Sequence, residues 1–186
     1  MTHTLCPWLW RPKLNASAQA LTVVHYQFVI ILGVVFSQNK KAMHIYFCGS
    51  IRGGRQDVGI YQKIVRKLQT YGEVLTEHVS HSDLSERGED GVQVEKFIHD
   101  RDVEWLQMCD VVIAEVTQPS LGVGYELGRA RDMHKKILCL FRPSSGKSLS
   151  AMIRGADDGS LFQVRDYKED EVEGLLDEYF KGHSKV

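Results

Sequence analysis

The chain has 186 residues, of which 43% are hydrophobic and 25% are charged, and its formal net charge is −1. These values are typical of one globular domain, and they exclude collagen-like, disordered and disulfide-scaffold proteins. The near balance of 23 basic and 24 acidic residues gives no reason to expect a surface that coats a nucleic acid polymer.

Residues 1–42 differ in composition from the rest of the chain. They contain four basic residues and no acidic residue, so residues 43–186 carry 19 basic and 24 acidic residues, a net charge of −5. The apolar run 21–36 is 16 residues long, whereas a membrane-spanning helix needs roughly 20. We predict that residues 1–42 are a poorly ordered extension; a targeting or anchoring segment and an integral part of the domain are the alternatives.

From His44 onward, short β-branched runs alternate with helical periods. This alternation predicts an α/β domain over 43–181, a small doubly wound, Rossmann-like sheet of five parallel strands flanked by helices, followed by a tail at 182–186. No membrane span is expected in this domain. The expected strands are 44–48, 74–79, 110–116, 137–141 and 161–164. The expected helices are 57–71, 92–108, 122–135 and 169–180, with a short helical turn at 150–153.

Two features of this pattern concern the second helix. The polar loop 80–91 is long for a compact domain, which predicts a functional lid or an adaptable region. The apolar stripe of helix 92–108 is expected to face the core and consists of Val94, Phe97, Ile98 and Trp105.

The four cysteines are scattered without a CxxC pair, which argues against a zinc site or a disulfide framework. Cys48, Cys109 and Cys139 lie in or beside expected strands and helices, so we predict small buried residues there. No metal or cofactor is expected.

The loop after the first strand is the first candidate ligand site, since ligands bind beyond the carboxyl ends of strands in such sheets. Its glycines allow backbone amides to approach a ligand, and its serine and arginines can donate to a phosphate. The residues are Gly49, Ser50, Ile51, Arg52, Gly53, Gly54 and Arg55. The spacing excludes a Walker A loop, and a purely structural turn is the alternative.

The loop after the third strand leads into the second candidate. The spacing of Gly122, Gly124 and Gly128 is one residue too long for a dinucleotide-binding fingerprint. Glu126 is expected in the first turn of a helix, where the helix dipole favours its ionised form, and beside the ligand cleft. The alternative is that Glu126 only stabilises the helix end.

The third candidate is on helix 92–108. Helical spacing places Asp102 at the edge of the apolar stripe, whereas Asp100 and Glu104 project elsewhere. A carboxylate at a buried edge is costly unless it is paired or used. His99 has no partner at metal-ligand spacing, so a solvated or hydrogen-bonded residue is expected there.

Long motifs in this domain resemble one enzyme family. They are YFCGSIRGGR (46–55), TEHV (76–79), IHDRDVEWLQMCDVVIAEVTQPSLGVGYELGRA (98–130), ILCLFRPSSG (137–146) and LSAMIRG (149–155). Over about 43–180 the chain is similar to the 2'-deoxynucleoside 5'-phosphate N-hydrolases, relatives of the nucleoside 2-deoxyribosyltransferases. The resemblance implies hydrolysis of the N-glycosidic bond of a deoxynucleoside monophosphate, yielding free base and 2-deoxyribose 5-phosphate.

The resemblance also implies residue roles. Glu126 would be the nucleophile, Asp102 the acid that assists departure of the base, and Tyr46 the residue that orients the reacting groups. Residues 49–55 would bind the phosphate together with Ser120 and Gly122. The segment Ser150, Ala151 and Met152 would bind substrate, with Ser150 contributed across a homodimer interface. A covalent glycosyl-enzyme intermediate and retention at the anomeric carbon follow from such a mechanism.

Other functions stay open. A deoxyribosyltransferase would use the same Glu126 ester, and a non-catalytic nucleotide-binding protein would release no base. Phosphoryl transfer is disfavoured, because the sequence has neither a Walker loop nor clustered metal-binding carboxylates. The resemblance implies a location in the cytoplasm and nucleus, with which reduced cysteines agree.

Overall fold

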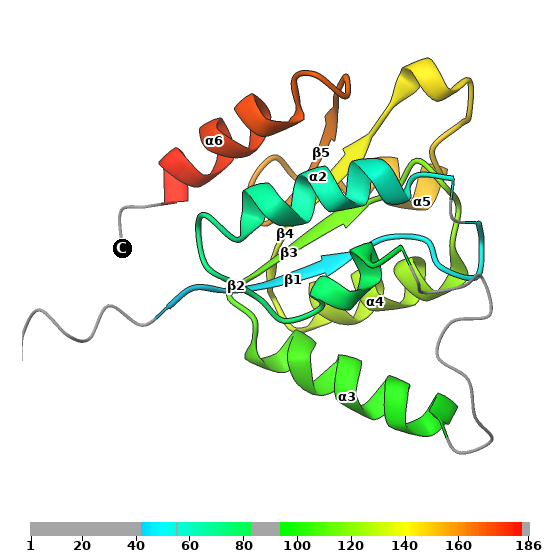
Figure 1. Ribbon diagram of the computed structural model, residues 1–186, viewed down its shortest axis with the longest axis vertical. Helices are drawn as coiled ribbons and strands as arrows, with labels where there is room; N and C mark the ends of the chain where they lie inside the picture. Colours follow the sequence, from blue (N-terminus) through cyan, green and yellow to red (C-terminus); the bar gives the residue numbers. More distant parts are fainter. Residues whose placement is uncertain (1–41, 55, 83–93, 184–186) are drawn as a thin grey trace, which may run out of the picture. The chain divides into compact units, whose positions relative to one another are not determined.

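Figure 1 shows the computed structural model, which describes residues 42–54, 56–82 and 94–183. In chain order its elements are β1 (His44–Cys48), α2 (Val58–Leu68), β2 (Glu73–Val74), η1 (Glu77–Ser80), α3 (Val94–Met108), β3 (Val111–Glu115), α4 (Leu121–Asp132), β4 (Lys136–Phe141), η2 (Pro143–Ser145), α5 (Ala151–Arg154), β5 (Phe162–Asp166) and α6 (Val172–His183). Outside the described residues lie 1–41 of the predicted extension, Arg55, most of the predicted loop 80–91, and 184–186.

The five strands form one parallel sheet in the order β2-β1-β3-β4-β5, which confirms the predicted α/β fold. Strand β1 pairs with β2 on one side and with β3 on the other, so the strand order reverses at β1. The register pairs Cys48 with Ala114, which places the carboxyl ends of β1 and β3 side by side. The loops that follow these two strands therefore meet where ligands bind in open α/β sheets.

Strand β1 supplies side chains to both faces of the sheet, because alternate residues of a strand point in opposite directions. Ile45 and Phe47 belong to the hydrophobic core that includes α2 and α6. Tyr46 and Cys48 belong to the core that includes α3 and α4. Figure 1 shows the two helix pairs on opposite faces of the sheet. The alternation within β1 thus directs a tyrosine and a cysteine towards α4.

The predicted strand 74–79 is wrong beyond Val74. Strand β2 contains only Glu73 and Val74, and the chain continues into the 3-10 helix η1. At Thr76 the side chain replaces the backbone pairing: Oγ1 accepts a hydrogen bond of 2.8 Å from Phe47 N and donates one of 2.6 Å to Phe47 O. Hydrogen bonds from the Thr76 side chain to the backbone of β1 therefore replace the backbone ladder at this point.

The predicted inner stripe of helix 92–108 is also wrong in part. Helix α3 begins the described segment at Val94, and Leu106 is its one buried residue among those described. Phe97, expected to face the core, is 61% exposed. The spacing of apolar residues predicted the helix correctly but not which of its residues are buried. The reason is that α3 borders a cavity instead of packing fully on the sheet. No described helix, α3 included, is long and apolar enough to span a membrane.

The cysteine prediction is confirmed for the described residues. Cys48, Cys109 and Cys139 are free thiols, and each is at most 2% exposed. Burial raises the pKa of all three, so they are held as neutral thiols.

Candidate active site

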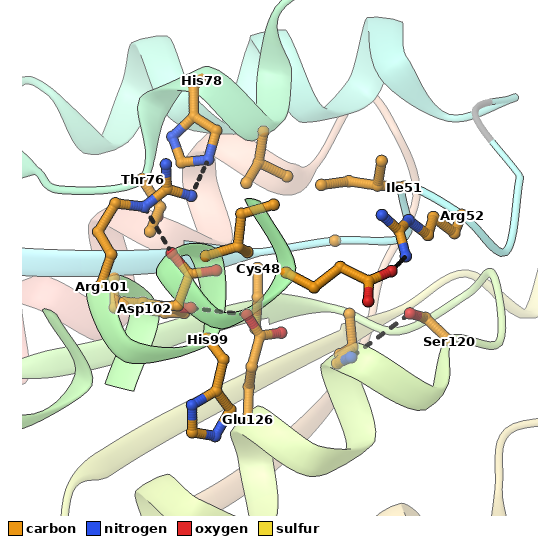
Figure 2. A pocket seen from close by; sticks show the side chains of 16 residues that line it. Cys48, Ile51, Arg52, Thr76, His78, His99, Arg101, Asp102, Ser120 and Glu126 are labelled. Carbon is orange, nitrogen blue, oxygen red and sulfur yellow. Dashed lines mark hydrogen bonds and ion pairs between the residues drawn. The ribbon is translucent and has the colours of Figure 1, made fainter. Parts of the chain in front are cut away.

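A cavity of about 310 Å³ opens at the carboxyl ends of β1 and β3 (Figure 2). Its walls come from β1 and the loop after it, from η1, and from one side each of α3 and α4. The lining residues are Tyr46, Cys48, Gly49, Ile51, Arg52, Thr76, His78, Val79, Glu95, Ile98, His99, Arg101, Asp102, Ser120, Val123 and Glu126. The cavity therefore contains all three predicted catalytic residues.

Glu126 and Tyr46 make a direct contact in this cavity. The Tyr46 phenol donates a hydrogen bond of 2.6 Å to Oε1 of Glu126. Tyr46 comes from the interior strand β1, and Glu126 is fixed by its neighbours Val123 and Leu127, which are buried against the sheet. Burial of such side chains contributes roughly 1.5–3 kcal/mol each. The carboxylate and the phenol are thus held by elements that cannot move independently of the core.

The position of Glu126 within its helix corrects the prediction. Ser120 is the N-cap of α4, with its Oγ accepting a hydrogen bond of 3.4 Å from Val123 N, and the helix begins at Leu121. Glu126 therefore lies in the second turn, beyond the strongest part of the helix dipole. The expected preference for the ionised form is absent.

The electrostatic environment of Glu126 is dominated by burial instead. Burial raises the pKa of Glu126 to about 7, the charge of Asp102 adds to the rise, and hydrogen bonds from Tyr46 and Cys48 oppose it. Burial and the nearby Glu126 carboxylate also raise the pKa of Tyr46, so the phenol stays protonated and donates. A carboxyl group that titrates near neutral pH in a cleft is a candidate for acid–base or nucleophilic work.

Asp102 forms an ion pair within the cavity. Arg101 Nε lies 3.0 Å from Asp102 Oδ1, and the Asp102 side chain is 23% exposed. Asp100 and Glu104 point away and are exposed, as predicted. The Arg101 guanidinium therefore lies directly against the Asp102 carboxyl group.

Arg101 and His78 are site residues that the sequence reasoning did not assign. Figure 2 shows both side chains beside Asp102, with Arg101 Nη2 lying 3.4 Å from His78 Nε2. The Arg101 guanidinium also lies 4.7 Å from the centre of the Trp105 ring. His78 comes from η1 and Arg101 from α3, so no spacing pattern in the chain could have paired them. Cys48, predicted only as a buried residue, also lines the cavity.

The predicted phosphate loop after β1 is partly in the cavity wall. Gly49, Ile51 and Arg52 line the cavity, whereas Ser50 lies behind it, fully buried. The backbone N–H of Ser50 donates to Tyr61 Oη at 3.1 Å, and its Oγ has no hydrogen-bond partner among the described residues. Arg52 Nη1 lies 3.4 Å from Glu95 Oε1 on α3.

Gly53 and Gly54 have structural reasons to be glycine. A Cβ on Gly53 would lie 2.4 Å from the carbonyl oxygen of Pro119, so the loops after β1 and β3 touch at this point. Gln118 Nε2 donates to the Gly53 carbonyl and reinforces the contact. Gly54 has a φ of +123°, a conformation that favours glycine. Neither glycine lines the cavity.

A buried ionic network supports these loops from behind. The Arg142 guanidinium contacts the carboxylates of Asp57 and Glu169, and its Nε lies 3.6 Å from Glu115 Oε1. Thr117 Oγ1 donates to Glu115 and accepts a hydrogen bond of 2.9 Å from Arg142 N. Burial raises the pKa of Glu115. The network ties together the segments that follow β1, β3 and β4.

The structure also has a second cavity, of about 580 Å³. Ser150 and Met152 line it, whereas Ala151 and Gly122 are exposed outside both cavities. Ser120 lines both cavities and so forms part of the wall between them. The structure of this chain alone therefore does not bring Ser150 to Glu126.

The described residues contain no group of three or more His, Cys, Asp and Glu side chains that could hold a metal ion.

The fold and motifs match known proteins. The family model of the nucleoside 2-deoxyribosyltransferases matches residues 45–160. A protein of Esox lucius named 5-hydroxymethyl-dUMP N-hydrolase is 85% identical over 144 residues, which are 77% of this chain and 99% of that one. A Homo sapiens protein of the same name is 64% identical over 137 residues, 74% of this chain and 79% of that one.

The solved structure of a Clostridium botulinum CMP N-glycosidase has a TM-score of 0.52, covers 72% of this chain and 98% of its own, and is 22% identical. At that identity the likeness shows the fold alone. The family match and the close relatives show more: this chain belongs to the nucleoside 2-deoxyribosyltransferase family.

Proposed function

We propose that this protein hydrolyses the N-glycosidic bond of 2'-deoxynucleoside 5'-monophosphates, and that 5-hydroxymethyl-dUMP is among its substrates. The observation that carries the proposal is the Glu126 carboxylate held by Tyr46 inside the cavity, with a glycine- and arginine-containing loop at the same opening. The names of the Esox lucius and Homo sapiens relatives support both the reaction and the substrate.

We assign the phosphate of the substrate to the loop after β1. Arg52 offers a charged donor at the cavity wall, and Ser120, the N-cap of α4, lies at the same end of the cavity. Charge-assisted donors of this kind bind phosphate strongly. Because residues 43–186 carry a net charge of −5, local positive charge is needed to attract an anionic substrate.

Glu126 is the proposed nucleophile. As the bond between C1' and the base breaks, positive charge develops on the deoxyribose ring, and a carboxylate oxygen of Glu126 can bond to C1'. Tyr46 holds Glu126 Oε1 at 2.6 Å and so orients the carboxylate in the cavity.

Water then resolves the ester. Its oxygen bonds to C1', the Glu126 carboxylate leaves, and 2-deoxyribose 5-phosphate is released with one proton passed to solvent or base. Two displacements at C1' give overall retention of configuration. The substrate phosphate, bound remotely from the reacting bond, supplies positioning energy.

We further propose that the active unit is a homodimer in which Ser150 reaches the substrate of the neighbouring subunit. Leu121 is 97% exposed and Met152 is 82% exposed, and both line the second cavity together with Ser150. Large apolar side chains exposed around a cavity are typical of an interaction surface. Ser120 in the shared wall would bring that surface close to the phosphate.

Product analysis tests the proposed function. The full chain is incubated with each deoxynucleoside monophosphate, including 5-hydroxymethyl-dUMP, and mass spectrometry identifies equal amounts of free base and 2-deoxyribose 5-phosphate. Glu126→Gln is expected to lose at least about a thousandfold in turnover while still binding nucleotide. Glu104→Gln, which changes an exposed carboxylate of α3, is the matched control. Near-normal turnover by Glu126→Gln contradicts the nucleophile assignment.

A second candidate function is deoxyribosyl transfer, which the description of the matching family favours. The same Glu126 ester would be transferred to an acceptor base instead of water. Adding an excess of a labelled free base to the reaction separates the two: labelled deoxynucleotide indicates transfer, and sugar phosphate alone indicates hydrolysis.

A further inference from the structure

The cavity has two chemically different ends. Figure 2 shows Arg52 and Ser120 at one end and His78, Arg101 and Asp102 at the other, with Glu126 between them. If the phosphate binds at the Arg52 end and C1' lies at Glu126, as the proposed function holds, the base must lie at the Arg101 end. This inference therefore rests on the proposed function.

Several of the described residues hold Arg101 in place. Its Nε lies 3.0 Å from Asp102 Oδ1, its Nη2 lies 3.4 Å from His78 Nε2, and its guanidinium lies 4.7 Å from the centre of the Trp105 ring. The side chain is 17% exposed. A guanidinium is planar, always charged and only donates hydrogen bonds. The result is an oriented cation in the wall that faces the base.

Cleavage of the N-glycosidic bond leaves negative charge on the base, which a nearby cation can stabilise. When the bond from C1' to the base breaks, both electrons stay with the ring nitrogen of the base. In an oxo-pyrimidine such as a uracil, this negative charge spreads onto the carbonyl oxygens. A cation held beside those oxygens stabilises the developing negative charge.

We propose that Arg101 binds a carbonyl oxygen of an oxo-pyrimidine base and stabilises that base as it departs as an anion. In the first step the Glu126 oxygen bonds to C1', the bond from C1' to the base breaks, and the base leaves with the electron pair beside Arg101. In the second step water replaces Glu126 at C1', and the proton it releases neutralises the base. Asp102 and His78 act as positioning residues that orient the guanidinium.

The assignment predicts a dependence on the leaving group. A 5-fluoro substituent withdraws electrons and makes the departing uracil a better leaving group, so it needs less help from Arg101. A 5-methyl substituent has the opposite effect. Loss of Arg101 must therefore slow dTMP more than it slows 5-fluoro-dUMP, whereas a purely structural defect slows both by the same factor.

The experiment compares Arg101→Met, Arg101→Lys and the wild type on 5-fluoro-dUMP, dUMP, 5-hydroxymethyl-dUMP and dTMP, with kcat and KM measured separately. Lys96→Met removes an exposed cation from the same helix, outside the cavity, and is the matched control. We expect Arg101→Met to lower kcat for dTMP by about 10²–10³-fold, as loss of one charge-stabilising donor does in other enzymes, with a clearly smaller loss for 5-fluoro-dUMP. Arg101→Lys keeps the positive charge, so its kcat should lie between that of the wild type and that of Arg101→Met.

Each outcome decides the assignment. Equal losses on all four nucleotides, or unchanged kcat in both Arg101 variants, overturn it while leaving the proposed function standing. Failure of the wild type to release base from any nucleotide overturns the proposed function, and this inference falls with it. If Arg101→Met does not fold, the leaving-group dependence of Arg101→Lys alone supports or contradicts the role, because its side chain retains the stacking carbons.

Discussion

The phenol of Tyr46 on β1 donates a 2.6 Å hydrogen bond to the Glu126 carboxylate on α4, although 80 positions separate the two residues. The contact exists because β1 turns Tyr46 away from α2, and because α4 packs on that face of the sheet through Val123 and Leu127. It links the centre of the fold to the group proposed to react.

The first prediction concerns the pH dependence of activity. Glu126 must be ionised to react, and burial raises its pKa to about 7, so kcat/KM of the wild type should rise with pH through this region. The hydrogen bond from Tyr46 stabilises the carboxylate, so Tyr46→Phe should move this acid limb to higher pH and lower kcat by roughly tenfold or more. A pH–rate profile of both proteins measures the shift. Tyr71→Phe, at the distant contact with Asp177, serves as control, and an acid limb that stays in place contradicts the argument.

The second prediction concerns the stability of the free protein. The pKa of Glu126 is raised from 4.5 to about 7, so this group favours the folded state below about pH 4 and that advantage is lost as pH rises through 7. A tenfold change in an acid dissociation constant is about 1.36 kcal/mol, so the cost at pH 8 is roughly 3 kcal/mol. Glu126→Gln removes the ionisation. In denaturant unfolding, the free energy of unfolding of Glu126→Gln should increase relative to that of the wild type between pH 4 and pH 8. A difference between the two proteins that does not change with pH would contradict the raised pKa of Glu126.

The third prediction tests the contact between the two ligand loops. A Cβ at residue 53 would lie 2.4 Å from the carbonyl oxygen of Pro119, so Gly53→Ala must separate the loops. We expect a loss of about 1–3 kcal/mol in the free energy of unfolding and a higher KM for nucleotide. Gly59→Ala, on α2, meets nothing within 4 Å and should be neutral or stabilising by up to about 1 kcal/mol. Equal behaviour of the two variants in thermal melts would show that the loops tolerate separation.

The fourth prediction concerns the buried network. Arg142→Met leaves Asp57 and Glu115 without their cation in a buried setting, which should cost about 3–5 kcal/mol. Arg154→Met breaks the exposed pair with Asp166 and should cost at most about 1 kcal/mol. Chemical denaturation gives both values, and a small effect at Arg142 would mean that the network contributes little to stability.

The fifth prediction tests the shared site. If Ser150 acts on the neighbouring subunit, a mixture of Glu126→Gln and Ser150→Ala chains should recover part of the activity that each lacks, because one site of the mixed dimer then has both residues intact. Activity is measured after the two inactive proteins are unfolded and refolded together, with each refolded alone as control. No recovery, in a sample shown to be dimeric by light scattering, means that each site is self-contained.

Much of the fold follows from local pattern. The alternation of short β-branched runs with helical periods predicts a parallel five-stranded sheet flanked by helices, and the structure confirms it. The strand after α2 could not be predicted in full, because the side chain of Thr76 replaces the backbone ladder at Phe47. Such a substitution depends on a neighbour 29 positions away.

The candidate site, too, could be predicted only in part from the sequence. The spacing of Asp102 and the glycine-rich loop predict residues near a ligand, and both lie at the cavity. The ionisation of Glu126 was predicted wrongly, because the helix begins earlier, at the Ser120 cap, and burial then outweighs the dipole. The pairing of Arg101 with His78 depends on how η1 and α3 meet. No periodicity within either element encodes that contact.

Because β1 supplies side chains to both faces of the sheet, the strand does not tolerate an insertion or a deletion. Inserting or deleting one residue in His44–Cys48 would turn Tyr46 and Cys48 towards α2 and place Ile45 and Phe47 in the cavity. One such event would remove the partner of Glu126 and disrupt both hydrophobic cores together. A substitution in β1 changes one side chain, whereas an insertion or deletion there disturbs both the hydrophobic cores and the active site.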